Sequence, residues 1–375
     1  MIWIIIFLFS CYALLILALT FGFNKIKLFK PNHYKAQTNF SVIVPFRNEA
    51  ENLPLLLKAI VALKYNFNSV EFIFVDDDSN DASVAIINNF FTSDRFLKTV
   101  NFSILKNLRK SNSPKKDAIA TAISKAKHNW IVTTDADCIL PENWLITLDN
   151  FIVQNKPKMV VAPVNYKVND TFLAQFQLLD FMSLQGSTIG GFGINFPFLC
   201  NGANLTYQKE AFLKLNGFEG NTSIASGDDV FLFEKFKNVD KKAVQFLKSR
   251  DAMVTTFPVK TVGALINQRL RWASKTSKLK SIKVKLIGLL VFLVNLISIY
   301  SLFLSDNEWA AFLPILAKML IDLWLFVPTI AFYNHKKSFV KWYFLSALVY
   351  PVFSVFIVFK SLFSKYNWKG RSFKK

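Results

Sequence analysis

Four long apolar runs at the two ends of the chain constrain its fold most. Residues 1–23 carry no charged side chain, and further apolar runs lie at about 284–305, 310–333 and 339–363. Each run is long enough to cross a bilayer, which takes about 20 apolar residues. These runs help to explain why 52% of the 375 residues are hydrophobic. We expect one N-terminal transmembrane anchor and about three C-terminal transmembrane or re-entrant helices.

The charges beside these runs bear on how the chain is inserted. Residues 1–23 lack a basic start and a small-residue cleavage site, which favours a retained anchor over a signal peptide. Four lysines between residues 25 and 35 then place the next segment in the cytoplasm. Four full spans would put the C-terminus outside, whereas the basic tail, residues 364–375, favours the cytoplasm. The late segment that contains Pro351 is therefore a candidate re-entrant helix.

Residues 24–283 alternate short apolar runs with polar segments and are long enough for one globular domain with its own core. We expect strands at residues 40–44, 70–75, 100–105 and 130–133, and helices at 48–63, 81–91 and 113–127. Asn48 is the expected N-cap of the first helix. Strands that alternate with helices predict an α/β fold with a mostly parallel, doubly wound sheet.

Acidic residues follow two of the predicted strands and recur near residue 228. The clusters are Asp76-Asp77-Asp78, Asp135-Ala136-Asp137 and Asp228-Asp229. Open α/β sheets bind ligands beyond the carboxyl ends of their strands, which is where the first two clusters fall. We expect Asp78 or Ser79 to cap the next helix, which leaves Asp76 and Asp77 for a ligand.

The chemistry of these carboxylates suggests distinct roles. Asp135, Asp137 or both can hold Mg²⁺ or Mn²⁺, because these ions prefer oxygen ligands and offset charge on a departing diphosphate. The alternative is that Asp135 and Asp137 belong to a solvated turn that binds no metal. Asp229 is the expected general base, with Asp228 as the alternative, unless the pair only caps a helix at residues 230–236. A hydrolase that uses two carboxylates is disfavoured, because we find no paired acid for the leaving group.

The net charge of +20 suggests an anionic partner; the alternative for part of this charge is that surface lysines only keep the protein soluble. Nucleic acid is disfavoured, because the sequence has no basic recognition helix, zinc finger or RNP-like motif. Anionic membrane lipids and phosphorylated substrates fit better, because many basic residues lie near the apolar runs. The segment from Gln268 to Trp272 predicts a helix at the membrane surface. There Arg271 can pair with phosphate, and Trp272 can stack on an acceptor sugar or serve only as an interfacial anchor.

Taken in order, these motifs resemble those of the family 2 glycosyltransferases with a GT-A fold. The segments that carry the resemblance are SVIVPFRNE at 41–49, DDDSND at 76–81, PKKDAI at 114–119, DAD at 135–137, GDD at 227–229 and QRLRW at 268–272. It covers about residues 40–275, and Pro114 replaces a glycine that is usual in the family. The CNGAN segment at 200–204 resembles the family's acceptor-side loop, in which Gly202 would permit close backbone approach.

The resemblance implies a nucleotide-diphosphate sugar, UDP- or GDP-linked, as the donor. The donor-binding residues that it implies are Pro45, Glu49, Asp76, Asp77, Lys115, Lys116 and Asp135. The first four would recognise a uracil-like base, and either lysine would approach the diphosphate, unless both belong to a solvated face. Gln268, Arg271 and Trp272 would serve the acceptor or its phosphate.

The sequence therefore predicts a membrane-embedded, metal-dependent, inverting glycosyltransferase of the hexosyltransferase type. Its acceptor would be a lipid-linked or membrane-associated glycan, its product a glycolipid or cell-envelope polysaccharide, and its site the inner membrane. The expected parts are an anchor at 1–23, a cytoplasmic GT-A domain at 24–283, a transmembrane region at 284–363 and a tail at 364–375. The alternatives are a catalytically silent, nucleotide-sugar-binding membrane scaffold and a sugar nucleotidyltransferase.

Overall fold

The computed structural model describes residues 2–33, 35–93, 97–222, 224–276, 278, 281–304 and 308–373. The chain forms two compact units, each built from segments that are distant in the sequence. The sheet unit comprises Leu28–Lys167 and Cys200–Phe257, and the helical unit comprises Met1–Lys27, Val168–Leu199 and Pro258–Lys375. The linear division at residues 23, 283 and 363 remains a prediction.

The sheet unit contains, within the described residues, a seven-stranded sheet of order β3-β2-β1-β4-β7-β5-β8 and a two-stranded sheet of β6 and β9. The strands are β1 (Phe40–Phe46), β2 (Val70–Asp76), β3 (Phe102–Lys106), β4 (Trp130–Thr133), β5 (Met159–Val161), β6 (Val164–Tyr166), β7 (Leu205–Gln208), β8 (Val244–Phe246) and β9 (Val254–Thr256). The helices are α2 (Leu53–Val61), α3 (Ser83–Thr92), α4 (Pro114–Lys125), α5 (Trp144–Asn155), α7 (Lys209–Lys214) and α8 (Asp228–Val239). Short 3₁₀ turns are η1 (Phe67–Ser69), η2 (Leu97–Thr99), η3 (Gly202–Asn204) and η4 (Lys241–Ala243).

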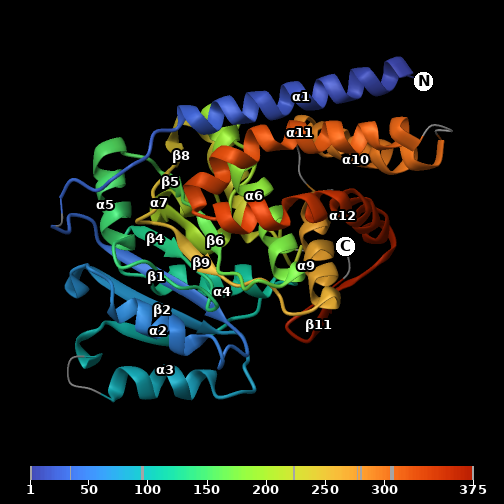
Figure 1. Cartoon of the computed structure of the whole chain (residues 1–375). Helices are drawn as coiled ribbons and strands as arrows, with labels where there is room; N and C mark the ends of the chain where they lie inside the picture. The colour runs from blue at the N-terminus through green and yellow to red at the C-terminus, as the bar shows by residue number, and fades with distance from the viewer. Residues whose placement is uncertain are drawn as a thin grey trace. The chain divides into compact units, whose positions relative to one another are not determined.

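The strands β3, β2, β1 and β4 pair in parallel, which confirms the predicted α/β fold with its mostly parallel sheet (Figure 1). Val42, Ile43 and Val44 of β1 are fully buried, as expected for a strand covered on both faces. The sequence did not predict the strands β7, β5 and β8 that complete this sheet, of which β7 runs antiparallel to β4 and β5.

Two predicted helix starts are wrong. The first helix, α2, begins at Leu53 with Asn52 at its N-cap position, whereas Asn48 adopts a left-handed φ of 52°. The backbone amide of Asn48 instead donates to Ser79 Oγ at 3.0 Å. The next helix, α3, begins at Ser83, so neither Asp78 nor Ser79 caps it. Asp81 joins both turns: its Oδ2 accepts the Ala50 amide before α2, and its Oδ1 accepts the Ser83 amide at the start of α3, both at 3.0 Å.

The helical unit consists of longer elements and a terminal hairpin. Its helices are α1 (Ile2–Lys25), α6 (Phe172–Gly193), α9 (Val262–Thr276), α10 (Ile282–Leu304), α11 (Glu308–Tyr333) and α12 (Lys336–Phe363), and its hairpin pairs β10 (Tyr366–Trp368) with β11 (Arg371–Phe373). Within this unit, α1, α10 and α11 lie along one another (Figure 1).

Four of these helices, α1, α10, α11 and α12, are long and apolar enough to cross a membrane, which confirms the four predicted apolar segments. Pro351 lies inside the continuous, 28-residue α12. At about 1.5 Å per residue, a helix of this length extends about 42 Å, more than the hydrocarbon core of a bilayer. The side of the membrane on which each end lies remains a prediction.

Three glycines allow α1 and α6 to pack backbone against backbone. A Cβ on Gly190 of α6 would overlap the carbonyl oxygen of Leu19 in α1, and a Cβ on Gly193 would overlap the carbonyl oxygen of Gly22. Close approach through small residues is a frequent way for helices to associate in membranes. This contact ties α6 to the N-terminal apolar helix.

We predict that Gly193→Ala destabilises the helical unit by about 1–3 kcal/mol, because the added methyl group would force the two backbones apart. The control is Gly288→Ala in α10, where an added Cβ meets no atom within 4 Å. Thermal unfolding of the detergent-purified variants should give a lower midpoint for Gly193→Ala than for Gly288→Ala. Equal midpoints would contradict the close contact.

Candidate active site

The carboxyl ends of the parallel strands form one edge of the sheet. Hydrogen bonds continue the strand ladder there: the amide of Asp77 donates to the carbonyl of Phe46, and the amide of Asn107 donates to that of Asp76, both at 2.9 Å. The loops after β1, β2 and β3 are thereby held side by side. This register places the predicted acidic clusters after β2 and β4 at the same edge.

Asp77 and Asp76 have different surroundings at this edge. Asp77 is 6% exposed, and its Oδ1 accepts hydrogen bonds from Asn107 at 2.7 Å and Arg109 at 3.4 Å. Asp76 is half-buried, and its Oδ1 accepts the amide of Ser79 at 3.0 Å. The Asp77 side chain is therefore held by residues of the loop after β3, whereas the Asp76 side chain stabilises the turn that follows it.

The other predicted base-binding residues flank this turn. Pro45 is half-buried in β1, opposite Val75 of β2. Glu49 is buried; its amide donates to Ser83 Oγ at 2.9 Å, and its Oε2 accepts Asn52 Nδ2 at 2.6 Å. Glu49 thus joins the start of α2 to the start of α3, and its part in base recognition remains a prediction.

Lys115 lies at the centre of the acidic clusters. Its Nζ is 2.6 Å from Asp135 Oδ1 and 3.3 Å from Asp228 Oδ2. Pro114 occupies the first turn of α4, so the helix presents Lys115 from its first turn. Burial lowers the pKa of Lys115, but Asp135 and then Asp228 raise it, so that the pKa lies above its usual value. One ammonium therefore joins the start of α4, the end of β4 and the start of α8.

Lys116 has a different environment. It is 1% exposed, and its Nζ donates to the carbonyls of Asn221 at 2.7 Å and Ile224 at 2.8 Å. Its ammonium also lies 5.1 Å from the ring centroid of Phe231. Adjacent helix residues point about 100° apart, so only one of the two lysines reaches both acidic clusters. Of the two lysines left open by the sequence, Lys115 is the one placed there.

Two glycines fix the position of the Asp228-Asp229 pair. Gly227, at the N-cap of α8, has a left-handed φ of 82°, and a Cβ there would meet the Phe231 ring at 2.6 Å. A Cβ on Gly202 would lie 3.1 Å from Asp228 Oδ2, which confirms the expected close backbone approach. The Gly202 amide donates to Asp229 Oδ2 at 3.3 Å. Asp228 and Asp229 therefore occupy the first turn of α8, beside the loop before β7.

Asp135 and Asp137 occupy the turn after β4, and both are half-buried. The Cys138 amide closes this turn on the Asp135 carbonyl at 3.2 Å. The thiol of Cys138 is buried, and burial followed by the nearby Asp137 and Asp135 carboxylates raises its pKa.

The donor set of this turn fits a divalent cation shared with a substrate. Among the described residues, no cluster of three or more His, Cys, Asp or Glu side chains could hold an ion by itself. Mg²⁺ typically takes one or two protein carboxylates and completes its shell with substrate phosphates and water. Asp135 and Asp137 offer that donor set, and a diphosphate would supply the remainder.

Gln268, Arg271 and Trp272 lie on α9 in the helical unit, beside the buried Arg269, which the sequence reasoning did not single out. Arg269 Nε is 2.5 Å from Asp180 Oδ2 of α6, and its guanidinium lies 4.1 Å from the Trp272 ring centroid. Arg269 also donates to the Gln268 side chain. Arg269 thereby orders Gln268 and Trp272.

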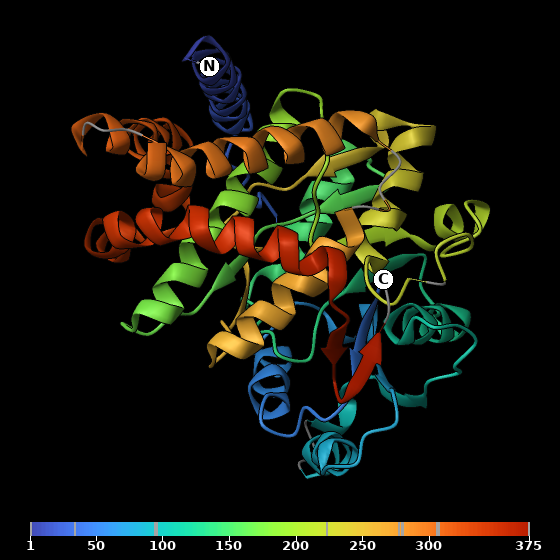
Figure 2. The ribbon, with the colours of Figure 1, turned by 90° about the vertical axis from the view of Figure 1, so that its right-hand side faces the viewer.

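The terminal hairpin packs on the same helix (Figure 2). The guanidinium of Arg271 lies 5.6 Å from the ring centroid of Trp368 in β10. The Asn367 amide donates to Asn267 Oδ1 at 2.9 Å, and Asn267 Nδ2 donates back to the Asn367 carbonyl. The hairpin therefore holds one face of α9, including Arg271.

The sequence reasoning also missed Asn107 and Arg109, which hold Asp77. A signal for them was present, because both directly follow the predicted third strand, where the strand-end rule applies as it does after β2 and β4. Arg109 additionally lies 3.7 Å from Asp117 Oδ2 in α4, which links this loop to the helix that carries Lys115.

The chain combines a mostly parallel α/β sheet, with acidic loops at one edge, and a unit of membrane-length helices. These features define the class as membrane-associated enzymes of the α/β type. The model for glycosyl transferase family 2 matches residues 41–212, and that for glycosyl transferase family group 2 matches residues 130–359. The second match covers more than half of the chain, so the chain belongs to this glycosyltransferase family.

Two relatives are similar to parts or all of the chain. The glycosyltransferase GlyG of Streptococcus pneumoniae serotype 4 is 28% identical over 131 residues, which are 35% of this chain and 40% of GlyG. The match thus spans less than half of that relative. The mannosyltransferase PcManGT from Pyrobaculum calidifontis, solved with GDP-Man and Mn²⁺, has a TM-score of 0.52 and 15% identity over 95% of this chain and 99% of its own. The two share a fold.

We predict that Lys115→Met destabilises the sheet unit by about 1–3 kcal/mol, because Asp135 and Asp228 lose a buried hydrogen-bonding partner. The control is Lys125→Met, an exposed lysine on the same helix, which should change stability by at most about 0.5 kcal/mol. Denaturant unfolding followed by tryptophan fluorescence measures both. A Lys115→Met variant as stable as wild type would contradict the bridging role of this ammonium.

Proposed function

We propose that the chain transfers a hexose from a UDP- or GDP-linked sugar to a lipid-linked or membrane-associated glycan acceptor, with inversion at the anomeric carbon. The observation that carries the proposal is the Lys115 ammonium, 2.6 Å from Asp135 and 3.3 Å from Asp228. It joins the turn expected to hold a metal to the turn expected to hold the catalytic base. Donor and acceptor chemistry would then share one place at the sheet edge.

The donor would lie across the carboxyl ends of the parallel strands. Asp76 and Asp77, with Pro45 and Glu49 beside them, would bind the base and ribose, because carboxylates accept hydrogen bonds from N–H and O–H groups. Lys115 would approach the diphosphate, whereas Lys116 is held by the 221–224 segment. PcManGT, which shares the fold, binds GDP-Man with Mn²⁺. A nucleotide-sugar donor is consistent with this layout.

Asp229 would remove the proton from the acceptor hydroxyl as that oxygen attacks the anomeric carbon. Its Oδ2 accepts the Gly202 amide, which orients the carboxylate, and Asp228 is drawn toward Lys115 instead. Asp228 is then a positioning residue, with the role of base as its alternative. A Mg²⁺ or Mn²⁺ ion bound by Asp135 and Asp137 would neutralise charge on the departing diphosphate. No carboxylic acid is needed for the leaving group.

The acceptor side would involve α9 and the membrane-length helices. Gln268, Arg271 and Trp272 would contact the acceptor or its phosphate, with Arg269 and the β10–β11 hairpin holding them in place. Four helices long enough to span a bilayer support a location in the inner membrane. We place the sheet unit in the cytoplasm, where nucleotide sugars are made, and expect a glycolipid or cell-envelope polysaccharide as the product.

We predict that Asp137→Asn and Asp229→Asn each reduce turnover at least about 100-fold, because each amide keeps the shape of the carboxylate but loses its charge and basicity. Unfolding midpoints should stay near that of wild type. The control is Glu142→Gln, an exposed carboxylate paired with Lys64 at 2.6 Å. It should retain full turnover, and near-normal activity of Asp229→Asn would overturn its assignment as the base.

A donor screen tests the reaction class. Detergent-purified protein with Mn²⁺ or Mg²⁺, a panel of sugar nucleotides and a membrane lipid extract should release nucleoside diphosphate from one donor. EDTA should abolish that release, because the diphosphate would then depart without charge neutralisation. Pyrophosphate as the product would indicate a nucleotidyltransferase. Absence of both release and metal-dependent sugar-nucleotide binding would favour a scaffold.

A further inference from the structure

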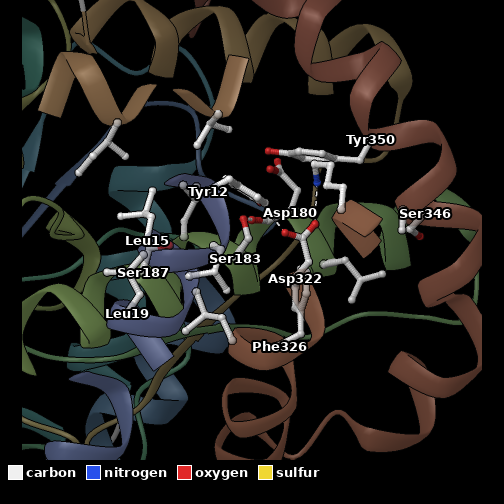
Figure 3. A pocket seen from close by; sticks show the side chains of 18 of the residues that line it. Tyr12, Leu15, Leu19, Asp180, Ser183, Ser187, Asp322, Phe326, Ser346 and Tyr350 are labelled. Atoms are coloured by element: carbon white, nitrogen blue, oxygen red, sulfur yellow. Dashed lines mark hydrogen bonds and ion pairs between the residues drawn. The ribbon is translucent and has the colours of Figure 1, made fainter. Parts of the chain in front are cut away.

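A cavity of about 190 Å³ lies inside the helical unit, lined by residues of α1, α6, α10, α11 and α12 (Figure 3). An apolar cavity of about 150 Å³ already accommodates a benzene ring, so this one can take a branched or extended hydrocarbon segment. Most of its lining is apolar and includes Leu15, Leu19 and Phe326. Because four of these helices are membrane-length, the cavity is suited to a molecule that reaches it from the bilayer.

A buried ion pair adjoins this apolar lining. Lys318 of α11 is 5% exposed, and its Nζ lies 2.6 Å from Asp322 Oδ2, one turn along the same helix. The Tyr12 hydroxyl of α1 donates to Asp322 Oδ1, and the Lys318 ammonium lies 5.2 Å from the ring centroid of Tyr350. Ionisable groups inside membrane segments are costly and tend to mark functional sites.

The charges around the cavity are paired. Lys318 faces Asp322, and the other lining carboxylate, Asp180, is 2.5 Å from Arg269 Nε. Figure 3 shows Asp180, Asp322 and Tyr12 directed at the same space. A phosphate or carboxylate entering here would compete with these carboxylates for their cations. Paired charges therefore favour a neutral ligand over an anionic one.

One hydroxyl in the cavity lining, that of Ser346, lacks a hydrogen-bond acceptor among the described residues, and a ligand could provide one. Ser346 of α12 is 2% exposed, and its Oγ has no hydrogen-bond partner within the described part of the chain. Helix hydroxyls often donate to the carbonyl four residues back, as Ser298 and Thr329 do in this unit at 2.8 and 2.7 Å. A buried hydroxyl without a partner is unfavourable, and a carbonyl oxygen on a ligand would satisfy it.

We propose that this cavity binds the acyl chain of a neutral lipid, with an ester carbonyl accepting the Ser346 hydroxyl. Resting on the proposed function, the inference narrows its acceptor from a glycan to the lipid itself: an uncharged acyl lipid with a free hydroxyl, of the diacylglycerol type. The paired charges disfavour a phosphorylated isoprenoid at this position. The apolar lining holds the chain, and the polar head group remains outside the cavity.

Photo-crosslinking of the full-length protein tests the binding site. The probe is a diazirine-bearing diacylglycerol in phosphatidylcholine nanodiscs, and labelled peptides are located by mass spectrometry. We expect labelling of peptides from α11 and α12, and competition by unlabelled diacylglycerol but not by a polyisoprenyl phosphate. Equal competition by the anionic lipid, or labelling confined to other segments, would overturn the proposal.

Two variants of α12 serve as test and control in the same labelling experiment. Ala347→Phe places a ring in the cavity lining, whereas Val349→Phe adds the same ring two residues away, on a side chain that is 38% exposed and outside the lining. Labelling should fall at least about tenfold in Ala347→Phe and stay unchanged in Val349→Phe. Ser346→Ala, the milder change, should weaken binding about 2–10-fold, the cost of one hydrogen bond. Wild-type labelling in both Ala347→Phe and Ser346→Ala would contradict the assignment.

Transfer assays separate this inference from the proposed function. If the lipid in the cavity is the acceptor, Ala347→Phe raises the KM for diacylglycerol, while donor hydrolysis without acceptor stays at the wild-type rate. A wild-type enzyme that glycosylates another acceptor, with Ala347→Phe equally active, would overturn this inference alone. Cross-linking in the cavity without release of nucleoside diphosphate from any donor would instead contradict the proposed transferase activity.

Discussion

The Lys115 ammonium between Asp135 and Asp228 is the interaction on which the site depends. The sheet edge brings together four carboxylates in two clusters, Asp135 with Asp137 and Asp228 with Asp229. Two like charges about 4 Å apart repel by about 4 kcal/mol near a protein surface, so the clusters need a cation between them. Lys115 supplies it from the first turn of α4 and joins three segments that are distant in the sequence. A divalent metal ion would also supply positive charge to these carboxylates, and a diphosphate would bind to that ion.

Much of the sheet could be predicted because each parallel strand is a short, mostly apolar run. The strand at residues 130–133 has the predicted bounds, and β1 extends the predicted 40–44 by only two residues. The starts of α2 and α3 could not be predicted, since Asn48 and Ser79 bond to each other across two loops instead of capping helices. The strand-end rule placed the acidic clusters after β2 and β4 correctly at the sheet edge, yet it could not distinguish Lys115 from Lys116. That distinction depends on carbonyls of Asn221 and Ile224, more than 100 positions away.

The helical unit shows where hydropathy alone is insufficient. The helix α6 carries Gln175, Gln177 and Asp180, so its pattern does not stand out as a membrane segment, and it joins the unit through backbone contact with α1. Its polar residues are paired inside the unit: Gln177 with the Val259 backbone, and Asp180 with Arg269 of α9. A single buried carboxylate thus connects the helix that bears the Gln268–Trp272 motif to the interior of the apolar helices. Paired polar groups of this kind favour one arrangement of apolar helices that could otherwise slide past one another.

We propose that the acidic sheet edge forms a metal-dependent nucleotide-sugar site. Electron paramagnetic resonance of Mn²⁺, titrated into the purified protein with and without nucleoside diphosphate, tests it most directly. Because the protein offers two carboxylates and the substrate would supply the other ligands, Mn²⁺ should bind weakly alone and at least about tenfold more tightly with the diphosphate present. Asp137→Asn should remove this coupling. Mn²⁺ affinity that is unaffected by the nucleotide, or nucleotide binding that is equally strong in EDTA, would contradict the account.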